Sequence, residues 1–285
     1  MSENQQSHNY KQGYSSHTTS THESRTADSS ASFLLPHIKK TDRILDIGCG
    51  SGTITTGLAK LVPEGSVTGV DMSPEILARA KTLAAQSPIP AERQGSVIFE
   101  QGNVLEKLPY PDDTFDIVYN SQLMGHIPPP DLPRQAVSEM RRVLKPGGIL
   151  ASRAAISSHF YPASSNLDRL WYQNLSKVLR QGAPAHAEDT GSSLPAIYRS
   201  AGFDVEGGKV QVSAGTMVVA DKETRMFFAR RTAGQLSHGD PFYQSWLDAG
   251  ISEDEIRETV DAVKKWAETE DAWFAGLQCE ILGWK

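Results

Sequence analysis

The stretch ILDIGCGSGTITTGLA, residues 44–59, decides the fold because three glycines stand at alternate positions between an apolar run and a helical run. The apolar residues predict a buried strand over 43–47, and the pattern after the glycines predicts a helix over 54–61. Glycine allows the backbone to close on a ligand where a side chain would keep it away. The stretch therefore predicts a ligand-binding turn after the first strand of an α/β fold.

The same alternation continues to about residue 155. Strands are expected at 66–70, 97–101, 115–119 and 149–155, with helices at 74–85 and 132–144 and a turn at 146–148. Strands that alternate with helices predict βαβ units and a parallel sheet covered on both faces. Beyond this point we expect helices over 167–180, 194–201, 222–231 and 253–266, one or two short strands within 210–219, and a last strand over 278–284.

Composition limits the possible functions. A chain of 285 residues at 39% hydrophobic can bury one sizeable core with helical insertions. The net charge of −6, without a basic cluster, argues against binding to nucleic acid. Two cysteines far apart in sequence do not form a disulfide framework or a metal site. With no apolar stretch of about 18 residues and no signal peptide, we expect a cytoplasmic protein without stable membrane insertion.

The residues around the glycine turn indicate the ligand. A dinucleotide fingerprint requires a third glycine where Thr53 stands, so the pattern is instead Asp-x-Gly-x-Gly-x-Gly from Asp46. Asp71 ends the second strand, where a carboxylate accepts hydrogen bonds from ribose hydroxyls. Asp46 would attract a cation and repel a phosphate. With Asn103 and Val104 after the third strand to receive an adenine, the ligand expected is S-adenosylmethionine.

Four ordered motifs then resemble a known family. DIGCGSGT, GVDMSPEIL, GNVLEKLPYPDDTFDIV and VLKPGG are similar to class I S-adenosylmethionine-dependent methyltransferases, most closely the UbiE-like small-molecule group, over residues 28–155. The resemblance implies a Rossmann-like, seven-stranded, mostly parallel sheet with helices on both faces and a helical cap. It also implies three parts: a flexible segment or lid at 1–27, a cofactor-binding core at 28–156, and a remainder at 157–285 with cap insertions at 157–190 and 220–276.

The resemblance also implies roles for individual residues. The glycines would contact the methionine part of the cofactor, Asp71 the ribose, and Asn103 the adenine amino group, although many relatives carry Asp where Asn103 stands. Further cofactor contacts are expected at Asp46, Gly48, Cys49, Gly50, Gly52, Met72, Val104 and Asn120. Cys49 is expected to fill the loop without a redox role, because nothing nearby would lower its pKa.

Several residues keep two interpretations. His126 is either a general base for the acceptor or a loop histidine that shapes the pocket. A second set forms either a lid over the cofactor or a solvated tail: Tyr14, His17, His22 and Arg25. The aromatic residues after position 170 are expected to be mostly core, with about a third lining a substrate pocket.

The function expected is direct in-line methyl transfer to a small-molecule acceptor, quinone-type or secondary metabolite, without a metal ion. The alternative is a regulatory or scaffold protein that binds S-adenosylmethionine without transferring its methyl group. The acceptor atom and the oligomeric state stay open.

Overall fold

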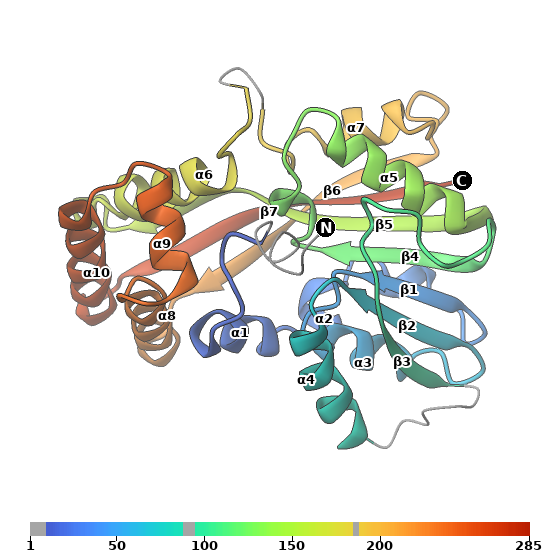
Figure 1. Ribbon diagram of the computed structural model, residues 1–285, viewed down its shortest axis with the longest axis horizontal. Coiled ribbons are helices and arrows are strands. Elements are labelled where there is room, and N and C mark those ends of the chain that lie inside the picture. Colours follow the sequence, from blue (N-terminus) through green and yellow to red (C-terminus); the bar gives the residue numbers. More distant parts are fainter. Residues whose placement is uncertain (1–9, 88–94, 185–187) are drawn as a thin grey trace. The chain divides into compact units, whose positions relative to one another are not determined.

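The computed structural model describes residues 10–87, 95–184 and 188–285. Its centre is a seven-stranded sheet with the order β3-β2-β1-β4-β5-β7-β6 (Figure 1). The strands are β1 Arg43–Ile47, β2 Ser66–Asp71, β3 Ser96–Gln101, β4 Phe115–Ser121, β5 Leu144–Tyr161, β6 Val210–Val219 and β7 Trp273–Trp284. The helices are α1 Ser16–Glu23, α2 Ala27–Ser30, α3 Thr53–Ala59, α4 Pro74–Ala85, α5 Leu132–Val143, α6 Asn174–Leu179, α7 Leu194–Ser200, α8 Lys222–Gln235, α9 Pro241–Asp248 and α10 Glu253–Glu268. The predicted seven-stranded Rossmann-like sheet is confirmed.

Parallel pairing brings the predicted ligand-binding ends of the strands to one edge. β1 pairs with β2 and with β4, β2 pairs with β3, and β4 pairs with β5, all in parallel. In this register Asp46 lies opposite Gly69 of β2 and Tyr119 of β4. The carboxyl ends of the strands therefore meet where the glycine turn begins.

The chain divides into two compact units. The first, the sheet unit, comprises residues 22–154, 184–214 and 279–285, and the second, the helical unit, comprises 1–21, 155–183 and 215–278. Three of the boundaries fall within β5, β6 and β7, one falls within α1, and one lies between α6 and α7. None of the described helices combines the length and the apolar composition needed to cross a membrane.

Each unit has its own core. In the sheet unit, apolar side chains of β1, β2 and β4 pack with those of α3 and α4. Tyr119 of β4 donates a hydrogen bond to the Ser30 carbonyl of α2 (2.6 Å), whereas the next residue, Asn120, contacts Met140 of α5. Because side chains alternate along a strand, α2 and α5 cover opposite faces of the sheet.

The helical unit is built around aromatic side chains. Its core holds Phe160, Trp171, Phe228, Phe242, Trp246, Trp266 and Phe274. Phe228 makes tilted or edge-to-face contacts with four of these rings, from α10, β5, β7 and the segment before α6. Phe227 and Trp273 of the same unit are exposed. The aromatic residues are thus mostly core, as expected.

The second half of the chain differs from the prediction in three places. β5 begins at Leu144, so the predicted turn at 146–148 lies within the strand as an excursion in which Gly147 has a φ of +77°. β7 starts at Trp273, earlier than expected. Helix α9 was not predicted, although Asp240 accepts a hydrogen bond from the Phe242 N–H and Pro241 occupies its first turn.

Candidate active site

The glycine turn combines an anchored start with an open face. Gly48, Gly50 and Gly52 have φ values of +72°, +54° and +77°, in the left-handed region that favours glycine. The N–H groups of Gly48 and Cys49 donate to the Val70 carbonyl, at 2.8 and 3.1 Å. A methyl group added at Gly52 would meet the Phe99 ring, but one added at Gly50 would meet no atom within 4 Å. The turn therefore leaves its backbone accessible at Gly50.

Asp71 ties this turn to the second strand. Its Oδ2 accepts a hydrogen bond from the Gly50 N–H and its Oδ1 accepts one from the Ser73 N–H, both at 3.0 Å. The side chain is only 8% exposed. A carboxylate held by two backbone donors is oriented before a ligand arrives, which suits a residue that must meet a ribose diol.

Asp46 is the second buried carboxyl group at this edge. It is 3% exposed, and the hydroxyl of Thr55 donates to its Oδ2 at 2.6 Å. Burial raises the pKa of Asp46 to about 7, the Thr55 hydrogen bond lowers it, and the charge of Asp71 raises it further. The site therefore contains a carboxyl group whose charge would be stabilised by a cationic ligand.

Cys49 lies within the glycine turn, between Gly48 and Gly50. Burial raises the pKa of its thiol well above the usual value, and the charges of Asp46 and Asp71 add to the effect. A partly buried thiol that stays protonated is unreactive, in keeping with the filler role expected from the sequence.

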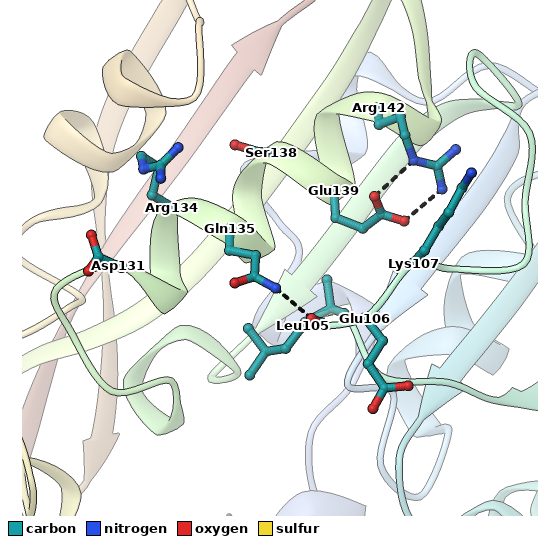
Figure 2. A pocket seen from close by; sticks show the side chains of 10 residues that line it. Leu105, Glu106, Lys107, Asp131, Arg134, Gln135, Ser138, Glu139 and Arg142 are labelled. Carbon is teal, nitrogen blue, oxygen red and sulfur yellow. Dashed lines mark hydrogen bonds and ion pairs between the residues drawn. The ribbon is translucent and has the colours of Figure 1, made fainter.

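The predicted adenine contacts follow β2 and β3. The Met72 carbonyl accepts a hydrogen bond from the Gln101 side chain at 3.2 Å. Asn103 uses its Oδ1 to accept the Leu105 N–H at 3.0 Å. Val104 is buried and is among the residues that line a cavity of about 640 Å³ between this loop and α5 (Figure 2).

Asn120, which is expected to line the site at the end of β4, has side-chain partners inside the sheet unit. Its side chain is fully buried and its Nδ2 donates to the Ser152 hydroxyl at 2.7 Å, which in turn lies 2.8 Å from the Tyr198 hydroxyl. These partners belong to β5 and α7. Asn120 thus belongs to a buried polar chain beneath the strand end.

His126 ends a 3-10 turn, Met124–His126, that follows β4. Burial lowers the pKa of His126 to about 4, and the positive charge of Arg25 lowers it further. Arg25 precedes α2 in the same unit, and the carbonyl of His22 accepts a hydrogen bond from the Thr53 hydroxyl at 3.2 Å. The segment 22–30 is therefore attached to the glycine-turn helix and brings a cation near His126.

The other two lid candidates lie in the helical unit. Tyr14 stacks on Tyr10 with ring centroids 4.9 Å apart, and the ring of His17 lies against Gly234 of α8. The four candidates therefore divide between the units, two in each.

The adjacent carboxylates Asp112 and Asp113 pair with basic side chains. Asp112 accepts from Arg142 and Asp113 from Lys285, both at 2.7 Å. Among the described residues, no group of three or more His, Cys, Asp or Glu side chains is placed to hold a metal ion.

Sequence reasoning missed Thr55 at this edge, and it named Arg25 as a lid candidate without placing its charge near His126. Thr55, the donor to Asp46, lies nine residues further along the chain in α3, and the charge of Arg25 lowers the pKa of His126. Thr55 follows the turn at a fixed helical offset, which is a usable local signal, whereas no local pattern joins Arg25 to His126.

Comparison with known proteins shows the family of the chain. Residues 44–148 match the methyltransferase domain family. The chain is 54% identical over 285 residues, the whole of both chains, to the probable methyltransferase ltbC of Aspergillus luteorubrus. It is 34% identical to the uncharacterized methyltransferase C1B3.06c of Schizosaccharomyces pombe, covering 96% of this chain and 95% of that one.

Among solved structures, the YcgJ protein of Bacillus subtilis superimposes with a TM-score of 0.56 at 18% identity, covering 89% of this chain and 97% of the other. That likeness concerns the fold. The cofactor is S-adenosylmethionine, as the methyltransferase family of the full-length relatives, the glycine turn and the two carboxylates indicate. The chain belongs to the class I S-adenosylmethionine-dependent methyltransferases.

Proposed function

We propose that the protein transfers the cofactor's methyl group to a small-molecule acceptor by direct in-line displacement. The observation that carries the proposal is the pair of buried carboxyl groups, Asp46 and Asp71, on either side of a glycine turn with an open face at Gly50. When bound, S-adenosylmethionine supplies a sulfonium methyl that is already activated. The protein therefore needs to bind, orient and exclude water, without a covalent intermediate.

Each residue at this edge has a distinct task in the proposal. Asp71, prepositioned by the Gly50 and Ser73 N–H groups, accepts hydrogen bonds from the ribose hydroxyls. Asp46 provides negative charge toward the cationic amino-acid part, and Thr55 holds its carboxyl group in place. Met72 and Val104 flank the adenine, and Asn103 faces its amino group. Asn120 supports the end of β4 from below through Ser152.

His126 is the candidate base, and its surroundings limit how much it can contribute. A pKa of about 4 keeps the imidazole neutral at physiological pH, which is the form that accepts a proton. The same low pKa makes it a weak proton acceptor, because efficiency in general base catalysis is greatest when the pKa lies near the working pH. We therefore assign most of the rate enhancement to positioning.

The acceptor is a quinone-type compound or a secondary metabolite, and labelled transfer identifies it. The purified protein is incubated with S-adenosylmethionine labelled in its methyl group and a small-molecule extract of the source cells. A labelled small product that requires the active protein supports the proposal. Micromolar binding of the cofactor without any labelled product would instead favour the regulatory or scaffold alternative.

A further inference from the structure

The side chain of Arg142 on α5 makes several of the hydrogen bonds that hold the loop between β3 and β4 against this helix. Arg142 donates from Nε to Glu139 Oε2 at 2.8 Å and from Nη2 to Glu139 Oε1 at 2.6 Å, a two-point contact visible in Figure 2. Its Nη1 also donates to Asp112 at 2.7 Å. The side chains of Arg142 and Glu139 are 21% and 13% exposed, so water weakens the Arg142–Glu139 ion pair less than it would weaken a surface pair.

The same two side chains also hold the backbone of the loop. Arg142 donates to the Tyr110 carbonyl at 2.9 Å and to the Leu108 carbonyl at 3.2 Å. Glu139 accepts the Leu108 N–H at 2.7 Å. One turn earlier on α5, Gln135 donates to the Leu105 carbonyl at 2.6 Å. The loop is thus attached to α5 from Leu105 to Asp112.

This attachment begins directly after the proposed adenine contacts. The Leu105 N–H donates to the side chain of Asn103, and Leu105 is itself held through its carbonyl by Gln135. Val104, between them, shares the wall of the 640 Å³ cavity with Glu139 and Arg142. A displacement of the loop would therefore move both Asn103 and Val104.

We propose that the Arg142–Glu139 pair positions Asn103 and Val104 and thereby sets the selectivity of the site for adenine. This inference rests on the proposed function, since it assumes that these two residues meet the adenine. Arg142 is a positioning residue here, because its contacts are to the loop and to α5. The pair would influence binding of the cofactor's base more than the chemistry at the methyl group.

The test compares two ligands that differ only at the base. S-Adenosylhomocysteine carries an amino group at position 6 of the purine, and S-inosylhomocysteine carries an oxygen there. We expect the wild-type protein to prefer the adenosyl ligand. In Arg142→Met, the dissociation constant for S-adenosylhomocysteine should rise about tenfold, and the preference over the inosyl ligand should fall severalfold. Calorimetry well below the melting temperature of each variant provides both values.

Two further variants separate position from charge. Arg142→Lys keeps the charge but lacks the planar fork that matches a carboxylate, so its selectivity should also fall. Arg134→Met is the matched control. Arg134 lies on α5 in the wall of the same cavity, and within residues 10–87, 95–184 and 188–285 it makes no hydrogen bond or ion pair. Its selectivity should equal that of the wild type.

The outcomes are separable. If Arg142→Met does not fold, Arg142→Lys and Gln135→Ala carry the test, because each weakens the same attachment with less disruption. An unchanged preference for the adenosyl ligand in folded variants of Arg142 would overturn the inference and leave the pair a stabilising role only. Failure of the wild-type protein to bind S-adenosylhomocysteine would overturn the proposed function instead.

Discussion

The glycine turn of the sheet unit and the aromatic core of the helical unit both have buried side chains beside them, but burial affects the stability of the two regions in opposite ways. The turn buries the carboxyl groups of Asp46 and Asp71 beside three glycines with positive φ. The aromatic core buries rings that contact one another edge to face. Burial of apolar rings stabilises the fold, whereas burial of a carboxyl group with few donors opposes it.

This difference in the effect of burial indicates which of the two regions binds the ligand. A buried charged group that has too few partners in the free protein is stabilised most when a ligand supplies the missing partner. Within the described residues, Asp46 has no cationic partner, and the proposed ligand carries a cationic group. In the aromatic core, by contrast, Phe228 is already surrounded by rings. Substitutions in the two regions should therefore change different quantities.

The largest effect should come from Phe228→Ala in α8. Phe228 is 5% exposed, and truncation of a buried phenylalanine costs about 3–5 kcal/mol of the free energy of unfolding. Its neighbour Phe227 is 38% exposed, so Phe227→Ala should cost less than about 1 kcal/mol. Urea denaturation measures both. Equal losses in the two variants would show that this core is not packed as described.

The next effect concerns Asp71→Asn. The substitution removes a charged acceptor from the Gly50 and Ser73 N–H groups and from the proposed ribose contact. The dissociation constant for S-adenosylhomocysteine should rise about 100-fold, equivalent to about 2.7 kcal/mol. Asp261→Asn, at an exposed carboxylate of α10 outside the proposed site, serves as the control. Unchanged affinity in Asp71→Asn by calorimetry would refute the ribose assignment.

Asp46→Asn should separate stability from binding. The folded-state pKa of Asp46 is about 7, above the unfolded value near 3.9, so the folded protein retains a proton that the unfolded chain loses. Stability from this group therefore falls as pH rises between about 4 and 7. The variant should gain stability over the wild type on going from about pH 5.5 to about pH 8, on the order of 2 kcal/mol.

The same variant should bind S-adenosylmethionine more weakly, because the negative charge facing the cation is gone. Melting curves of the ligand-free proteins at the two pH values measure the first effect, and calorimetry measures the second. A stability difference between variant and wild type that does not change with pH would contradict the burial of an ionisable Asp46.

The smallest effect is expected from His126→Gln. With a folded-state pKa of about 4, His126 is neutral throughout the range above that value, so the pH profile of wild-type turnover should show no inflection near 6.5 from this group. Turnover should fall less than about tenfold, with cofactor affinity unchanged. An inflection near pH 6.5 that disappears in the variant would establish a stronger base than the site indicates.

The sequence predicts the regions of this molecule unequally. The glycine turn and the carboxylates at strand ends were identified because strand, turn and helix are consecutive there, and local patterns encode them. The end of β4 was predicted less accurately: β4 continues to Ser121, two residues beyond the predicted end. Asn120 in this added part faces α5, on the side opposite to Tyr119.

Contacts between distant segments were beyond prediction for a different reason. Arg142 and the loop at 105–112 are about 30 residues apart, and no periodicity joins them. The strands β5 and β7 are longer than predicted. β5 extends over Leu144–Tyr161 on both sides of the predicted 149–155, and β7 begins at Trp273, before the predicted start at 278. Such features depend on tertiary packing that a pattern along the chain does not record.

The most direct measurement is calorimetric titration of the purified wild-type protein with S-adenosylhomocysteine and S-adenosylmethionine near neutral pH. The account predicts saturable binding of both at one site per chain, with dissociation constants in the micromolar range. It also predicts release of protons on binding, because Asp46 loses its proton beside the cationic amino-acid part of the ligand. Absence of saturable binding for both ligands would contradict the central claim that the glycine turn holds this cofactor.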